Sequence, residues 1–263
     1  MITAFEQNKM PPQVIIHGDC WPVVYTTEHV VKTLLPGLQC ETTFGLTTLS
    51  QRLNQAPDAL LILCLRPREH IFLFYALKNV LLSHPALVIC DELLFSDRVV
   101  LHNWGNIPVM LHQEYSVMVT RVRQEKCLFS VHSKLSRFLS APQPATGFFA
   151  VPMIFNQPKR LMNYMELLIH RATVACRLTP AQQKLLQELH RGQNRLSDMT
   201  GILKSGKRKI WQDKDQLLMK LGMRNRLREL LYGTRFCMAE QRTGFIPPEK
   251  AKHLFETANL SAP

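Results

Sequence analysis

The sequence predicts an α/β domain built on a five-stranded parallel sheet, followed by a smaller all-α domain. Three observations lead to this prediction. Short apolar runs alternate five times with amphipathic segments between residues 14 and 139. Residues 140–156, rich in proline and poor in charge, then interrupt the alternation. Beyond them, apolar residues recur with helical spacing only. Alternation of strand and helix favours parallel strands with helices on both faces.

Five short apolar runs are the expected strands. Residues 59–65 and 86–90 are apolar without interruption, which is typical of strands that helices cover on both faces. Arg66-Pro67 ends the first of these runs. The other three expected strands are residues 14–16, 40–44 and 108–112.

Helices are expected wherever apolar residues recur three or four positions apart. The first of them stops at Pro36-Gly37, and in the third Phe72, Ala76 and Val80 fall on one face. The expected helices of this half are residues 23–35, 46–54, 72–82, 93–104 and most of 115–139.

Positive charge is concentrated beyond residue 176. The chain of 263 residues has a formal net charge of +12. Residues 177–235 alone contain fourteen Lys or Arg and five Asp or Glu, so they carry a net +9. Such a concentration suggests a polyanionic partner. Charge alone also allows a basic surface that is merely solvated.

Cysteine usage and hydropathy indicate a cytoplasmic protein. The seven cysteines are scattered, without any C-x-x-C spacing, which argues against a disulfide framework and against a zinc finger. The N-terminus has no apolar core of a secretory signal. The longest apolar stretch, residues 71–82, is too short to span a bilayer.

Residues 178–236 predict four helices that include a helix-turn-helix. Thr179 can cap the first helix, with Pro180 in its first turn. A second helix over residues 196–203, a turn at 204–206 and a third helix over 207–221 complete the motif. In the third helix one face is apolar, and the opposite face carries Arg208, Trp211, Gln212 and Asp215.

Here the chain resembles the LuxR-type (NarL/FixJ) family of bacterial transcriptional regulators. The most specific match is at residues 220–226, which read Lys-Leu-Gly-Met-Arg-Asn-Arg, followed by Arg-Glu-Leu at 228–230. The family's opening Leu-Thr-x-x-Glu corresponds to Leu178-Thr179, with Gln182 in place of Glu. The family's Glu-Ile-Ala turn matches residues 198–200 only after a one-residue insertion.

The resemblance implies that the third helix lies in the major groove of DNA and that the fourth supports dimer contact. Trp211, Gln212 and Asp215 fall where the family reads base edges, and Gln212 can pair with adenine. Trp211 could pack on a thymine methyl or lie buried between helices. Asp213 and Asp215 are unfavourable near phosphates and suggest narrower specificity or weaker binding. The expected phosphate contacts are Lys204, Lys207, Arg208, Lys209 and Lys214, and the expected dimer contacts are Arg226, Leu227, Leu230 and Leu231.

Joined to such a domain, the first half looks like a response-regulator receiver, which has a flavodoxin-like fold. A working receiver has an acidic pair after its first strand for Mg²⁺ and a phosphate-accepting Asp at the end of its third. This chain has Gly18-Asp19-Cys20 and Cys64-Leu65-Arg66 at those places. We therefore expect a pseudo-receiver without phosphorylation, metal or cofactor, similar to the auxiliary regulators of the Rcs type.

These expectations divide the chain into four parts and suggest a function. The parts are a receiver-like domain (1–139), a linker with a connecting helix (140–176), a LuxR-type DNA-binding domain (177–236) and a C-terminal tail (237–263). The expected function is sequence-specific transcriptional regulation on double-stranded DNA in the nucleoid, as a homodimer or as a heterodimer with another LuxR-type regulator.

Other classes of function are less consistent with the residues. No Gly-x-Gly-x-x-Gly, Walker loop or Gly-x-Ser-x-Gly elbow is present, so we expect no enzyme and no small-molecule substrate. RNA binding would need exposed aromatic pairs on strands, and the sequence offers none that is evident. The alternative that remains is an auxiliary adaptor, which binds another regulator and has little DNA affinity of its own.

Overall fold

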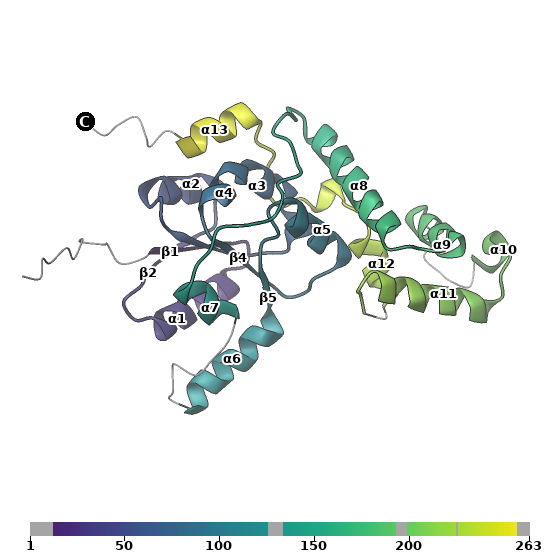
Figure 1. Ribbon diagram of the computed structural model, residues 1–263, viewed down its shortest axis with the longest axis horizontal. Coiled ribbons are helices and arrows are strands. Elements are labelled where there is room, and N and C mark those ends of the chain that lie inside the picture. The colour runs from purple at the N-terminus through teal and green to yellow at the C-terminus, as the bar shows by residue number, and fades with distance from the viewer. Residues whose placement is uncertain (1–12, 126–133, 193–198, 225, 257–263) are drawn as a thin grey trace, which may run out of the picture.

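The computed structural model of the chain describes residues 13–125, 134–192, 199–224 and 226–256 (Figure 1). Its centre is a five-stranded parallel sheet in the order β2-β1-β3-β4-β5. This order is that of the flavodoxin-like fold, so the predicted fold of the first half is confirmed. The strands are β1 (Gln13–Gly18), β2 (Gln39–Thr43), β3 (Leu60–Cys64), β4 (Ala86–Cys90) and β5 (Val109–Leu111).

Helices cover both faces of the sheet, because successive side chains of each buried strand point to opposite sides. In β1, Ile15 packs with one cluster of buried residues and Ile16 with the other. Helices α1 (Trp21–Leu34), α6 (His112–Glu125) and α7 (Lys134–Ser140) lie on the Ile16 side (Figure 1). The Ile15 side is covered by α2 (Leu46–Gln55), α3 (Ile71–Ala76), α4 (Lys78–Ser83) and α5 (Phe95–Asn103).

Two helices differ from the sequence prediction. Residues 72–82 form α3 and α4, which meet at Leu77, where ψ is 2°. Leu77 is fully buried, so the break does not expose the apolar face on which Phe72, Ala76 and Val80 lie. The long helix expected over 115–139 is described as α6 and α7, and residues 126–133 lie outside the described residues.

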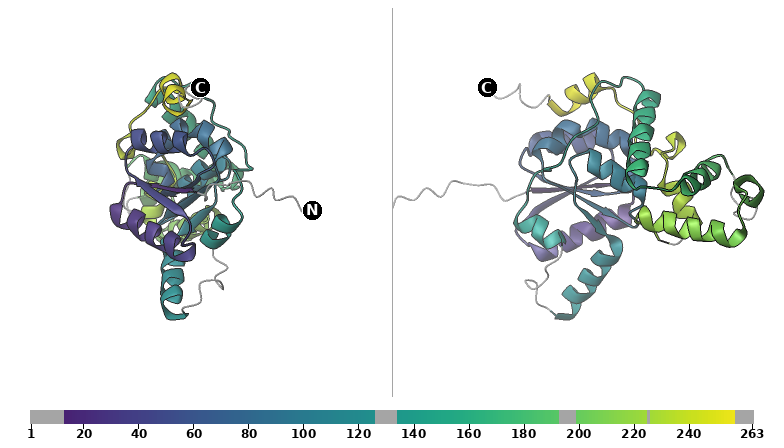
Figure 2. Two further views of the ribbon diagram at one scale, coloured as in Figure 1. Left: turned by 90° about the vertical axis from the view of Figure 1, so that its left-hand side faces the viewer. Right: turned by 45° about the vertical axis from the view of Figure 1, so that its right-hand side comes forward.

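In the described residues after α7 the named elements are all helices, and α9 to α12 project from one edge of the sheet domain (Figure 2). The long helix α8 (Pro158–Ala175) packs against α5. It leads into α9 (Pro180–His190), α10 (Met199–Leu203), α11 (Lys207–Lys220) and α12 (Leu227–Gly233). Residues 193–198, the start of the second helix predicted from the sequence, lie outside the described residues.

A capping box starts α9. The Thr179 hydroxyl accepts a hydrogen bond from the Gln182 backbone N–H at 3.3 Å, and the Gln182 side-chain oxygen accepts one from the Thr179 N–H at 3.0 Å. Gln182 is fully buried, and its amide also donates to Gln216 of α11 at 3.1 Å. Glutamine at this position therefore caps α9 and binds α11.

The C-terminal tail returns to the sheet domain. Its segments are a 3₁₀ turn at Met238–Glu240 and α13 (Pro248–Glu256), which packs on α2. Between them, the ring of Phe245 stacks on Tyr75 at 6.0 Å between centroids and meets the edge of Phe72 at 5.4 Å. Residues 237–256 thus complete the surface of the first half. Within the described part of the chain, no helix is both long and apolar enough to cross a bilayer.

The packing of α11 leads to a stability prediction. Leu217 is fully buried, whereas Met219, two residues later, is 71% exposed. Replacing Leu217 with Ala leaves a cavity, so we expect L217A to lower the free energy of unfolding by about 2–5 kcal/mol. The control M219A should change it by less than about 0.5 kcal/mol. Urea titration followed by circular dichroism measures both, and equal losses in the two variants would contradict this packing.

Candidate functional site

Helix α11 presents a polar face to solvent. Ile210, Leu217 and Leu218 are buried on the side that faces α9. Arg208 and Gln212 are exposed on the other side, and Trp211 is 52% exposed. The sequence left open whether Trp211 is exposed or buried between helices. Its indole is half-exposed, so it is not enclosed between helices. In Figures 1 and 2, α11 extends away from the sheet, beyond the described elements of the first half.

Four cations surround the start of α11. Lys204 lies in the preceding turn at φ +48°, and Lys207, Arg208 and Lys209 form the first turn of the helix. All four side chains belong to exposed residues. A helix N-terminus already favours anions through its free N–H groups, and the cations add to this field. We refer to Lys204, Lys207, Arg208 and Lys209 as the basic start of α11.

The two aspartates of α11 are both ion-paired. Asp213 is buried, and its carboxylate lies 3.2 Å from the Nζ of Lys209. The Asp215 carboxylate lies 3.0 Å from the Nζ of Lys214. Their repulsion of a nearby phosphate is therefore smaller than two free carboxylates would exert.

Lys214 does not fit its expected contact with phosphate. The residue is only 4% exposed, and its ammonium lies 4.1 Å from the centre of the Trp211 ring. The sequence contained the signal for this, because Lys214 follows Ile210 by four residues and precedes Leu217 by three. A lysine at that spacing lies at the border of the buried face, where its stem packs and its charge needs a partner.

Helix α12 packs within the chain, which corrects the expected dimer contact. Leu230 is fully buried, and Leu227 and Leu231 are half-buried against the same core. The partners of α12 are α9 and α5, the latter from the sheet domain. Of the four residues predicted for dimerisation, Arg226 is the exposed one. The spacing of apolar residues predicted an apolar face on α12 but could not predict that the chain's own first half covers it.

The junction between the two halves lies at the end of α11. Arg98 of α5 donates a hydrogen bond to the carbonyl of Leu221. The next residue, Gly222, has a φ of +60°, which favours glycine, and an added Cβ would lie 3.2 Å from the Arg98 guanidinium. Gly222 therefore ends α11 and allows the close approach of α5.

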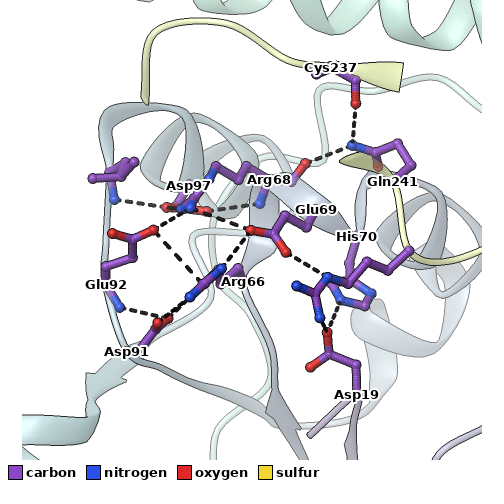
Figure 3. Close-up of polar contacts among 12 residues, drawn as sticks. Asp19, Arg66, Arg68, Glu69, His70, Asp91, Glu92, Asp97, Cys237 and Gln241 are labelled. Carbon is purple, nitrogen blue, oxygen red and sulfur yellow. Dashed lines mark hydrogen bonds and ion pairs between the residues drawn. The ribbon is translucent and has the colours of Figure 1, made fainter. Parts of the chain in front are cut away.

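At the carboxyl edge of the sheet, Asp19 follows β1 and is already bound. Its carboxylate lies 2.5 Å from Arg242 of the tail and 3.4 Å from the His70 ring (Figure 3). The hydrogen bond with His70, together with the Arg242 charge, lowers the pKa of Asp19 to about 2. Asp19 is thus a paired carboxylate and not half of an open acidic pair.

Arginines occupy the loop after β3. Arg66 binds Asp91 through two hydrogen bonds of 2.8 and 2.5 Å, and it also reaches Glu69 at 3.1 Å (Figure 3). Arg68 is buried and pairs with the fully buried Asp97 at 2.7 Å. We call Arg66, Arg68 and these carboxylates the arginine cluster. It ties the loop after β3 to the loop after β4 and to α5.

A cavity of about 340 Å³ remains at this edge, lined in part by Asp19, Cys64, Arg66, Cys90, His112 and Arg242. Burial raises the pKa of the Cys64 thiol to about 12, so the thiolate needed for nucleophilic attack is disfavoured. The residues present do not fit Mg²⁺, because the carboxylate of Asp19 already binds Arg242 and His70. Over residues 13–125, 134–192, 199–224 and 226–256, no cluster of His, Cys, Asp or Glu could hold a metal ion.

The tail contributes to this edge in a way that sequence reasoning missed. The Gln241 side chain accepts a hydrogen bond from the Ile71 N–H at 2.9 Å and donates one to the Arg68 carbonyl at 2.8 Å. Arg242 adds a backbone hydrogen bond to the Glu69 carbonyl at 2.9 Å. We call Gln241 and Arg242 the tail clasp. No local pattern predicts it, because Arg242 lies 223 residues from Asp19.

The tail clasp leads to a prediction about Asp19. Removing the cation in R242Q should raise the Asp19 pKa from about 2 part of the way to its ordinary value, with His70 still lowering it. A lowered carboxyl pKa stabilises the folded state above about pH 4, and this contribution disappears as the pH falls toward 2. The stability difference between wild type and R242Q should therefore shrink over that range.

Carbon-13 titration of the carboxyl signals, with urea unfolding at each pH, measures both quantities. The control K250Q changes an exposed cation of α13 and should leave the Asp19 signal unmoved. An unchanged Asp19 pKa in R242Q would contradict the ion pair.

Comparison with known proteins gives a structural likeness only. Scans against protein-family models and against curated proteins find no match. A structure of two RcsB dimers bound to two parallel DNAs is 17% identical, covering 84% of this chain and 96% of that one, with a TM-score of 0.49. An RcsB–DNA complex has the same identity and coverage and a TM-score of 0.48. The RcsB response regulator of Salmonella typhimurium is 18% identical over 85% of this chain and 96% of its own, at a TM-score of 0.37. Likeness at these values carries no argument about activity.

Proposed function

We propose that the chain is a sequence-specific DNA-binding regulator of transcription whose helix α11 enters the major groove. The observation that carries this proposal is the exposed face of α11, with Arg208, Trp211 and Gln212 beside the basic start. A helix with its side chains is about 10–12 Å in diameter, so α11, of 14 residues, can lie in the major groove, which is about 12 Å wide.

The proposed contacts divide into two kinds. The basic start of α11 binds phosphates, which gives affinity and orientation without sequence information. Gln212 and Trp211 read base edges, where a Gln amide matches adenine and an apolar ring can meet a thymine methyl. Asp215 lies on the same side but is paired with Lys214, so we give it no direct base contact.

The proposal also covers assembly and location. A regulator of this kind reads two half-sites as a homodimer, or as a heterodimer with a similar regulator, in the nucleoid. Leu230 of α12 is fully buried, so we propose that a second copy contacts α12 through its exposed side, where Arg226 lies. The proposed division of the chain keeps the DNA-binding part at residues 177–236, and residues 237–256 of the tail join the receiver-like part, on which they pack.

We further propose that the first half acts without phosphorylation. The Arg66 guanidinium stands after β3, and a guanidinium cannot form an acyl phosphate. The carboxylates nearest to it, Asp91 and Glu69, are engaged by that same arginine. The proposed function includes no catalytic step.

An adaptor that binds another regulator is a second candidate, favoured by one observation. Three aromatic residues, Trp21, Tyr25 and Phe44, are 66%, 50% and 45% exposed. Their rings contact one another at 6.2 and 6.0 Å between centroids. Exposed aromatic groups of this kind are common at the centres of protein interfaces.

The proposed function as a regulator predicts that the protein binds DNA specifically and with an affinity that depends on salt. A site selected from random duplexes should be bound with a Kd below about 10 µM at moderate salt. Substituting Arg208 with Ala removes one phosphate contact, so R208A should reduce the slope of log K against log salt by about one. The control K159A changes an exposed cation of α8 and should leave affinity and slope unchanged. Electrophoretic mobility shifts over a salt series distinguish the DNA-binding regulator from the adaptor. An adaptor should bind no DNA site with a Kd below about 10 µM.

If the first half acts without phosphorylation, phosphate donors should neither label the protein nor change its affinity for DNA. Incubation with labelled acetyl phosphate should leave the chain unlabelled, because the position after β3 offers no free carboxylate. Beryllium fluoride should leave the Kd for the selected site unchanged within about twofold, a shift of about 0.4 kcal/mol. A receiver with an intact acceptor Asp serves as the positive control. Label on Asp91 or Asp19 that alkali or hydroxylamine releases, as expected of an acyl phosphate, would refute this part of the proposal.

A further inference from the structure

A buried cation lies directly behind the reading face of α11. The Lys214 side chain is only 5% exposed, so its ammonium is largely shielded from solvent. It meets two groups on the same helix, the Asp215 carboxylate at 3.0 Å and the Trp211 ring at 4.1 Å from the centroid. A buried ammonium is costly unless partners replace its hydration, and a carboxylate and an aromatic face both do so.

This arrangement fixes the position of the indole. An ammonium is attracted to the face of an aromatic ring and not to its edge, because the face carries the negative end of the ring quadrupole. The face of Trp211 that meets Lys214 is thereby turned inward. The rest of the indole accounts for its 52% exposure and lies beside Arg208 and Gln212, both exposed.

We infer that Lys214 is a positioning residue that holds Trp211 as an apolar platform for the methyl group of thymine. The inference rests on the proposed function, since it assigns a base to one residue of the proposed reading face. Thymine is the base that presents a methyl group in the major groove, so an apolar plane held there distinguishes it from the other three. Lys214 itself touches no base.

The same lysine also neutralises Asp215 next to the DNA. Losing the charge of Lys214 would free the indole and expose a carboxylate to the phosphates. These two effects are separable, because a free carboxylate weakens binding to every sequence alike, whereas a displaced indole removes only the preference for thymine. In the double variant K214M/D215N the free carboxylate is removed as well. Any loss of the preference for thymine that remains in the double variant therefore comes from the displaced indole.

The first measurement needs no DNA. The chain has three tryptophans, so its ¹⁵N-labelled indoles give three N–H signals, and W211F assigns one of them to Trp211. We expect K214M to shift the Trp211 signal and to leave those of Trp21 and Trp104 in place. K214R keeps a cation that stacks on aromatic faces and should retain the native signal. The control K207M changes an exposed cation of the same helix.

The outcome of this measurement is decisive for positioning. An unchanged Trp211 signal in K214M overturns the inference. Should K214M fail to fold, seen as loss of the signal of the fully buried Trp104, K214Q replaces it with a neutral polar side chain. A shift in both K214M and K207M would mean that any charge on α11 moves the signal, and it would overturn the inference as well.

The second measurement tests the base. Duplexes selected by the wild-type protein from a random pool are amplified with either dTTP or dUTP, which differ by the thymine methyl. Burying one methyl group corresponds to about a fourfold change in affinity. We expect the wild type to bind the thymine duplexes about fourfold more tightly. K214M with D215N should lose this preference, and K207M should weaken binding to both pools equally.

The results separate the inference from the proposed function. If the wild type binds thymine and uracil duplexes equally well, the proposed function as a regulator stands, but the assignment of thymine to Trp211 is wrong. If the wild type binds neither pool, the proposed function as a DNA-binding regulator is wrong, and so is the assignment of thymine. The indole signals still show in that case whether Lys214 fixes the position of Trp211.

Discussion

A single hydrophobic core joins the parallel sheet to the helices that follow it. One cluster of buried residues runs from Ile15 and Leu61 in the sheet, through Val100 of α5, to Leu217 of α11 and Leu230 of α12. Burial of this apolar area is the dominant favourable contribution to folding, and it cannot be divided between two independent halves. The orientation of α11 follows from this constraint. Its apolar side is held by the shared core, which leaves its polar side to solvent.

At the carboxyl edge of the sheet, ion pairs engage the acidic side chains. In open α/β sheets this edge is where ligands and reactive groups are placed. Here the acidic residues at the edge are bound by arginines, both from the loop after β3 and from the tail. A buried or half-buried ion pair that loses one partner leaves an uncompensated charge. The arginine cluster and the tail clasp therefore depend on each other's geometry and stabilise one closed arrangement.

Local patterns were sufficient to predict most of the elements and insufficient to predict how they meet. Five strands, their parallel arrangement and the helix-turn-helix follow from apolar periodicity, and Thr179 and Gln182 indicated the start of α9 correctly. The periodicity of α11 predicted which side of that helix would be exposed. It misplaced Lys214, because residue type was given more weight than position between Ile210 and Leu217.

The remaining differences come from contacts between distant parts of the chain. The apolar face of α12 is covered by α5, more than 120 residues earlier, and only the tertiary structure identifies that partner. The break at Leu77 is likewise a feature of packing, since both halves of the segment keep their apolar residues inward. The structural role of the tail rests on Gln241 and Arg242, two polar residues whose sequence neighbours give no indication of a binding partner.

The tail clasp has a consequence for the order in which the molecule is completed. Because the chain is synthesised from its N-terminus, β1 and Asp19 leave the ribosome long before Arg242 and Phe245 do. Until the tail emerges, the rings of Phe72 and Tyr75 lack the cover of Phe245, and Asp19 lacks its arginine partner. Helices α8 to α12 are synthesised during that interval. The contacts of Arg242 and Phe245 with the first half therefore form among the last in biosynthesis. They can form only after all the helices between α8 and α12 have been synthesised.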